Sequence, residues 1–378
     1  MYITLSISGH GHHPAAWRKS TLPLNVGGIP RYDGVVRVAE AATLDAVIFT
    51  PPRFDKSLLA NGITDVLQLD NLSVIGSLAA VTNSIGLGAS SPIRYNEPFN
   101  IARSFSALDN LTAGRSCWLI DLEGHSWTPA DFGHASNLSI DDHYCRAEEF
   151  LIVVRKLWDS WEDGAVLADK LNGMFADSGK IHPINYAGNF FSVRGPLVAV
   201  RPPQGHPPIF MDDMSSAGKR LAASYGDVLI APCGDRAQAI SLTNEMRAAS
   251  KAASRGGAAL KILMMLCPIL AKDERSAKNR ADDLDQSSDQ DAVRSMPPRF
   301  VGTPAGLVSH MSEWVDAGAC DGFNLAFPVL SEDVSVLVQD VVPKLKQAGL
   351  FRAEYPGSTM REHLGLRRPT SQFSKEVA

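Results

Sequence analysis

Oxygen and imidazole side chains recur at two-residue spacing in two short stretches of the chain. His10 and His12 follow its first apolar run, and Asp121, Glu123 and His125 lie at the end of a later one. Side chains two residues apart point to the same side of a strand. If both strands run on through these residues, their donors converge and can bind a divalent metal that generates a hydroxide nucleophile.

A second interpretation of the same residues stays open. Acids and histidines are common in surface loops, and the spacing rule lapses where a strand ends, so Asp121 and Glu123 can equally be solvated loop acids. Asp212 follows another short apolar run and is a further carboxylate that can join the metal donors. The chain lacks the G-x-S-x-G motif of serine hydrolases, so it offers no nucleophilic serine of that kind.

Apolar runs of strand length alternate with helical segments along the chain. The runs expected as strands are Ile3–Ile7, Leu44–Thr50, Ile85–Ser90, Ser116–Leu122, Pro208–Met211, Asp227–Ile230, Lys261–Leu266 and Asp321–Leu325. Segments such as Asp33–Ala42 and Leu72–Thr82 lie between them and are compatible with helices. This alternation is typical of a parallel sheet covered by helices.

Eight strand-helix units in 378 residues predict a single α/β domain, an eight-stranded parallel β/α (TIM) barrel with its active site at the carboxyl ends of the strands. An open, doubly wound sheet is the alternative, although no G-x-G-x-x-G motif follows the first strand. After the fourth strand, residues 141–205 predict an insertion made of a long helix and a short hairpin. Residues 272–300 are highly polar and predict a mobile crossover or lid.

Composition excludes several classes of partner. The chain is 45% hydrophobic and 20% charged with a net charge of -5, and no basic cluster indicates a nucleic-acid partner. No apolar run reaches the roughly 18 residues that span a bilayer, and no signal peptide is evident, so we expect a cytoplasmic protein that does not bind membranes. The five cysteines lack metal-type pairing, which favours reduced structural thiols.

Several sequence blocks carry a wider pattern. They are GHHPAAWR at 11–18, YNEPFNIAR at 95–103, LDNLTAGR at 108–115, LWDSWED at 157–163, VRGPL at 193–197, VGTP at 301–304, DGFNL at 321–325 and the tail GLFRAEYPGSTMREHLGLRRP at 349–369. In these blocks the chain resembles the bacterial-luciferase-like flavin monooxygenases. Within them it is most similar to the nitrilotriacetate, dibenzothiophene-sulfone and long-chain-alkane monooxygenase branch. The resemblance covers nearly the whole chain and implies a barrel of the luciferase-like type.

The resemblance also implies an activity. Enzymes of this kind oxygenate a small organic substrate with dioxygen and reduced FMN, which a separate NAD(P)H-flavin reductase supplies. The same resemblance implies a homodimer.

Residue by residue, the resemblance implies that Ser90, Tyr144, Met214 and Ser215 hold the cofactor, with Tyr144 and Ser215 on the phosphate. If the chain is a monooxygenase, His12, His13, His125 and Asp212 are the candidates for transferring protons or positioning the substrate.

The departures from the family pattern fall where flavin should bind. After the fourth strand, the family's W-N-V-V-T-S is replaced by Trp118-Leu119-Ile120-Asp121-Leu122-Glu123, and after the fifth strand its Q-A-G-x-S is replaced by Met211-Asp212-Asp213-Met214-Ser215. In the long helix, the family's H-D-x-R-Y is replaced by Ile140-Asp141-Asp142-His143-Tyr144. The aspartate that the family has after the second strand is replaced by Pro51. A carboxylate about 4 Å from a phosphate charge costs ~1 kcal/mol in water, or ~4 kcal/mol at an effective dielectric constant near 20. A helix N-terminus returns only ~0.3 to 2 kcal/mol. Either aspartate therefore opposes phosphate binding unless it is protonated or paired with Lys219 or Arg220, and the sequence does not decide which of the two faces the pocket.

Three hypotheses follow from these observations. The leading one is an FMN-dependent monooxygenase. The second is a barrel that has lost flavin and performs metal-assisted or acid-base chemistry, with His10, His12, Asp121, Glu123 and His125 as the metal donors. The third is a non-catalytic partner subunit of an active homologue.

Overall fold

The computed structural model describes residues 1–25, 27–51, 69–122, 132, 138–253, 259–288 and 290–373. Within them, nine parallel strands form one sheet, in which β12 lies outside a closed ring of the other eight. The ring runs β1-β2-β3-β4-β9-β10-β11-β13, and β13 pairs with β1 again. The predicted β/α barrel is confirmed, and the open-sheet alternative is wrong because the first and last strands pair.

All eight expected strands are present with small changes at their ends. The strands of the ring and its extension are β1 (Tyr2–Ile7), β2 (Ala46–Phe49), β3 (Gly86–Pro92), β4 (Ser116–Asp121), β9 (Ile209–Met211), β10 (Val228–Ala231), β11 (Lys261–Leu270), β12 (Arg299–Gly302) and β13 (Gly322–Leu325). Strand β11 runs beyond the predicted Leu266 because its outer half pairs with β12.

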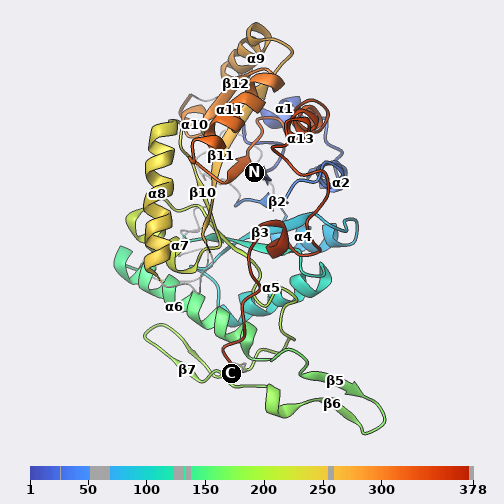
Figure 1. Ribbon diagram of the computed structural model, residues 1–378, viewed down its shortest axis with the longest axis vertical. Helices are drawn as coiled ribbons and strands as arrows, with labels where there is room; N and C mark the ends of the chain where they lie inside the picture. Colours follow the sequence, from blue (N-terminus) through green and yellow to red (C-terminus); the bar gives the residue numbers. More distant parts are fainter. Residues whose placement is uncertain are drawn as a thin grey trace.

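Helices cover the outside of the barrel (Figure 1). They are α1 (Ala16–Lys19), α2 (Asp33–Ala41), α4 (Asn71–Ala79), α5 (Pro98–Leu111), α6 (Ile140–Asp159), α7 (Ser216–Tyr225), α8 (Arg236–Ala252), α9 (Glu274–Gln286), α10 (Gln290–Arg294), α11 (Pro304–Asp316), α12 (Leu330–Val336), α13 (Val342–Gln347) and α14 (Met360–His363), with a π-helix at Leu337–Val341. No helix among the described residues is long and apolar enough to cross a membrane.

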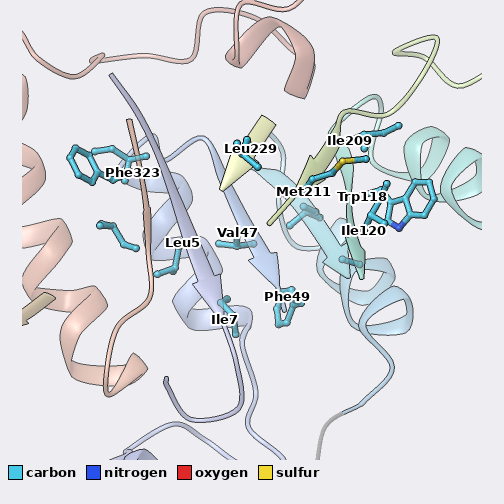
Figure 2. Packing of buried hydrophobic residues seen from close by; sticks show 14 of the residues in the cluster. Leu5, Ile7, Val47, Phe49, Trp118, Ile120, Ile209, Met211, Leu229 and Phe323 are labelled. Carbon is cyan, nitrogen blue, oxygen red and sulfur yellow. The ribbon is translucent and has the colours of Figure 1, made fainter. Parts of the chain in front are cut away.

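Two apolar layers hold the barrel together. The larger lies between the strands and the helices; Figure 2 shows Leu5 and Ile7 of β1 beside Val47 and Phe49 of β2 in this layer. The smaller fills the barrel interior, where Leu119 and Phe210 lie among its members. Strand β1 alternates between the two environments, because its apolar residues face the helices while Thr4 donates a 2.8 Å hydrogen bond to Asn324.

Carboxylates fasten the amino ends of the strands. Asp45, Asp227 and Asp321 each immediately precede a strand, and each accepts a hydrogen bond from a backbone N–H of the neighbouring strand, at 2.6, 3.0 and 2.8 Å. Each also pairs with an arginine, at 2.7 Å for Arg352, 3.0 Å for Arg361 and 2.9 Å for Arg247. These contacts tie β1 to β2, β9 to β10 and β11 to β13.

The C-terminal tail closes the same end of the barrel. Met360, Leu364 and Leu366 belong to the interior apolar cluster. Arg361 pairs with Asp227 and donates to the carbonyl oxygen of His206 at 2.6 Å, so the tail is joined to the barrel by charge as well as by apolar contact. The opposite end, at the carboxyl ends of the strands, is the end left for a site.

Two predicted segments differ in detail from the structure. Helix α6 packs on α5, where Trp158 Nε1 donates to the carbonyl oxygen of Ala102 at 2.9 Å, so it is the fourth covering helix of the barrel rather than part of an insertion. Two antiparallel hairpins follow it in place of the single one predicted. They are β5 (Val166–Asp169) with β6 (Met174–Ala176), and β7 (Tyr186–Ala187) with β8 (Ser192–Val193).

The polar segment 272–300 forms helices α9 and α10 and the start of β12. Figure 1 shows α9 at the end of the molecule opposite the β5–β6 hairpin. That this segment moves as a lid stays a prediction.

Replacing Arg361 by leucine should destabilise the fold. The Arg361→Leu variant leaves the buried Asp227 carboxylate without its counter-charge, which typically costs ~3 to 5 kcal/mol. Urea unfolding followed by circular dichroism measures this loss. Arg367→Leu, at an exposed arginine of the same tail, is the control and should change the free energy of unfolding by no more than about 0.5 kcal/mol. Equal stability of the two variants would contradict the role assigned to Arg361.

Candidate active site at the carboxyl ends of the strands

Three side chains meet where α6 and α7 begin. The Tyr144 hydroxyl donates to Asp213 Oδ2 at 2.7 Å and lies 2.8 Å from Ser215 Oγ. Ser215 is the N-cap of α7, where its Oγ accepts from the N–H of Gly218 at 2.9 Å. Asp213 Oδ1 accepts from the N–H of Ser215 at 2.8 Å. We call Tyr144, Ser215 and the first turn of α7 the anion cradle, because hydroxyls and a helix N-terminus favour a negatively charged ligand.

Proton counting assigns the direction of each bond in the cradle. A tyrosine hydroxyl has one proton, and in this geometry it goes to Asp213. The 2.8 Å contact between the two hydroxyls is then a bond from Ser215 Oγ to the Tyr144 oxygen. Each hydroxyl proton is therefore already used within the cradle.

The structure decides which aspartate faces the cradle. Asp213 binds Tyr144 and Ser215, whereas Asp212 is exposed at the end of β9. Lys219, one of the two residues considered as a counter-charge for this acid, instead binds Glu245 at 2.8 Å. Met214, predicted to contact the cofactor, is half-buried and packs against the apolar layer around the barrel.

Ser90, Leu119 and Asp121 lie in the carboxyl halves of β3 and β4. Ser90 is 7% exposed, and its Oγ accepts from Asn71 Nδ2 at 2.7 Å. Leu119 belongs to the interior cluster, and Asp121 has the same parity on β4, so it too points inward. Leu122 instead joins the layer between strands and helices. The inward-facing side chains in this part of the barrel are thus apolar at Leu119 and polar at Ser90 and Asp121.

Comparison with known proteins places the chain in a family. The model of the luciferase-like monooxygenase family matches residues 12–319. The chain belongs to the luciferase-like monooxygenase family. It is 32% identical to N-acetyl-S-(2-succino)cysteine monooxygenase of Bacillus subtilis (strain 168) over 98% of this chain and 97% of that protein. It is also 32% identical to nitrilotriacetate monooxygenase component A of Aminobacter aminovorans, over 97% of this chain and 96% of the relative.

Solved structures support the fold of this luciferase-like monooxygenase. The crystal structure of DmoA from Hyphomicrobium sulfonivorans superposes with a TM-score of 0.85 at 24% identity, over 96% of this chain and 92% of that one. The predicted family, barrel fold and enzyme class are confirmed.

The side chains of His12 and His13 of the monooxygenase bind different partners. His12 Nε2 lies 3.2 Å from the carbonyl oxygen of Ser6, close to the end of β1. His13 is buried and points away to α9: its Nδ1 accepts from the N–H of Ala15 at 3.1 Å, so its proton is on Nε2, which lies 3.2 Å from Asp285 Oδ1. Burial lowers the pKa of His13 more than the bond to Asp285 raises it. His13 thus joins the loop to α9, and its role as a proton-transfer residue stays only a prediction.

The metal-binding alternative finds no support in the part of the monooxygenase that the structure describes. There, no group of three or more His, Cys, Asp or Glu side chains could hold a metal ion, so His10, His12 and Asp121 do not form one. Strand β4 ends at Asp121, because its partner β3 ends opposite it at Pro92, and the two-residue alternation is not continued by the strand. Glu123 and His125 lie outside the described residues.

Sequence reasoning missed two partners of site residues in the monooxygenase. Asn71 holds Ser90, and Asp285 holds His13. No sequence pattern marks either residue as a partner, because each lies on a helix outside the barrel and contacts a residue far away in the sequence. Asp213 had a detectable signal, because an aspartate stands where the family has glycine.

A double-mutant cycle should reveal the contact between His13 and Asp285. His13→Gln and Asp285→Asn each remove one partner of the bond, and the coupling between contacting residues is typically ~0.5 to 3 kcal/mol. Chemical unfolding of the two single variants and the double variant measures it. Pairing His13→Gln with Asp282→Asn, at an exposed acid of α9, is the control cycle and should be additive. Additivity in the first cycle as well would show that the two residues do not support each other.

Proposed function

We propose that the chain is the oxygenase of a two-component system that uses reduced FMN and dioxygen to oxygenate a small organic substrate. Family membership supports the reaction class. The observation that carries the proposal is the meeting of the Tyr144 and Ser215 hydroxyls, 2.8 Å apart, at the N-terminus of α7. Both residues belong to the set expected to hold the cofactor, and they come from helices that follow different strands.

The residues of the site suit a flavin in two ways. Leu119 and Phe210 of the barrel interior offer an apolar floor for a ring system. The anion cradle offers hydroxyl and backbone N–H donors for the ribityl phosphate end of the flavin. Asp213 already accepts from two of these donors, the Tyr144 hydroxyl and the Ser215 N–H. Reduced FMN, when bound, supplies the two electrons that allow dioxygen to place one oxygen atom in the substrate and the other in water.

The protein's own residues would orient the ligand and exclude water. The interior apolar cluster and the C-terminal tail close the amino end of the barrel, which would keep water from reaching the site through that end. Asn71 fixes the hydroxyl of Ser90 so that it faces a defined direction. His12 and Asp212 stay the candidates for proton transfer or substrate positioning near the strand ends, together with His125, which lies outside the described residues.

The two-component arrangement is also part of the proposal. One relative is named component A of nitrilotriacetate monooxygenase, which supports a separate NAD(P)H-flavin reductase as the source of reduced FMN. We extend the proposal to a homodimer that acts in the cytoplasm.

Anaerobic equilibrium dialysis of photoreduced FMN tests the proposed function. The native chain should bind it with a micromolar dissociation constant, and Ser215→Asp should weaken binding about tenfold or more, because a further carboxylate enters the anion cradle. Ser309→Asp makes the same change on an exposed face of α11 and should leave binding unaltered. Absence of binding by the native chain, or equal binding by both variants, would contradict a flavin at this position.

A further inference from the structure

We propose that Asp213 sets the flavin preference of this site. Its carboxylate occupies the place in the anion cradle that a terminal phosphate would take, so reduced flavin without a phosphate, such as reduced riboflavin, binds at least as tightly as reduced FMN. The inference rests on the proposed function, because it assumes that a flavin lies across the carboxyl ends of the strands.

The contacts of Asp213 place it inside the cradle. Its two oxygens accept from the Tyr144 hydroxyl at 2.7 Å and from the N–H of Ser215 at 2.8 Å. The same carboxylate packs on the first turn of α7, where a Cβ atom at Gly218 would collide with Asp213. Gly218 therefore leaves the room that the carboxylate fills. Asp213 acts as the anion of its own helix N-terminus.

Hydrogen-bond counting separates the two flavins. A phosphate dianion has only acceptors, and the protons of Tyr144 and Ser215 are already used, the first by Asp213 and the second by the Tyr144 oxygen. A phosphate must displace Asp213 before it can accept those protons. The terminal hydroxyl of a phosphate-free flavin has a proton to donate, and the Asp213 carboxylate has free lone pairs to accept it.

Charge acts in the same direction. The Asp213 carboxylate is itself a negative charge in the cradle, whereas Asp141, one turn before Tyr144 in α6, is exposed, so solvent and salt screen it. The ammonium of Lys219, which follows in α7, is paired with Glu245 at 2.8 Å. A phosphate dianion brought to the cradle is repelled by the Asp213 carboxylate, whereas a neutral ribityl end is not.

Competition between two flavins tests the inference. Anaerobic dialysis measures the dissociation constants of photoreduced FMN and photoreduced riboflavin for the native chain, Asp213→Asn and Asp213→Gly. The ratio of the FMN constant to the riboflavin constant should be about one or larger in the native chain and should fall about tenfold or more in both variants. Asp213→Asn keeps the shape of the side chain, so it tests charge even if the glycine variant loosens the start of α7.

The control and the contrary outcomes are distinct. Asp142→Asn removes an exposed carboxylate near the cradle and should change the ratio by less than about threefold, because solvent and salt screen its charge. Native protein that binds reduced FMN about tenfold more tightly than riboflavin, or a ratio unaffected by both Asp213 variants, overturns the inference and leaves the proposed function intact. Failure of the native chain and of both variants to bind either flavin overturns the proposed function and this inference with it.

Discussion

The closed barrel depends on carboxylates that hold the amino ends of its strands in place. Asp45 and Asp321 each use one oxygen to bind the N–H of a neighbouring strand and the other for an arginine. In Asp227, Oδ2 accepts from the strand N–H and from Arg361, and Oδ1 accepts a second bond from Arg361. Burial raises the pKa of Asp45, and the charge of Arg352 opposes that rise. Because a buried carboxylate is costly without such partners, strand pairing, salt bridge and tail docking depend on one another.

This arrangement separates stability from function along the barrel axis. The amino end is filled by Met360, Leu364 and Leu366 of the tail and fastened by ion pairs of the tail with Asp45 and Asp227. The carboxyl end collects polar side chains that the fold does not need for closure, such as Ser90 and Asp212. Loops at that end can therefore change while the barrel stays the same, which is how related barrels act on different substrates.

The anion cradle contains a carboxylate of its own. Tyr144 and Ser215 carry the hydroxyls that we propose for a flavin, and Asp213 accepts the proton of Tyr144 and the backbone N–H of Ser215. A hydroxyl has a single proton to give, so a carboxylate within the site competes with any anion from outside. Lys219, one turn into α7, does not relieve this competition, because it pairs with Glu245.

The eight strands of the barrel could be predicted from the sequence, because buried parallel strands are continuous apolar runs. The matched blocks singled out Tyr144 and Ser215, and their role in holding phosphate stays a prediction. Pattern could not choose between Asp212 and Asp213 or anticipate that His13 binds Asp285, since these contacts join residues that lie on different elements. Only tertiary structure decided them, because side-chain direction beyond a strand end follows the loop and its packing rather than a fixed period.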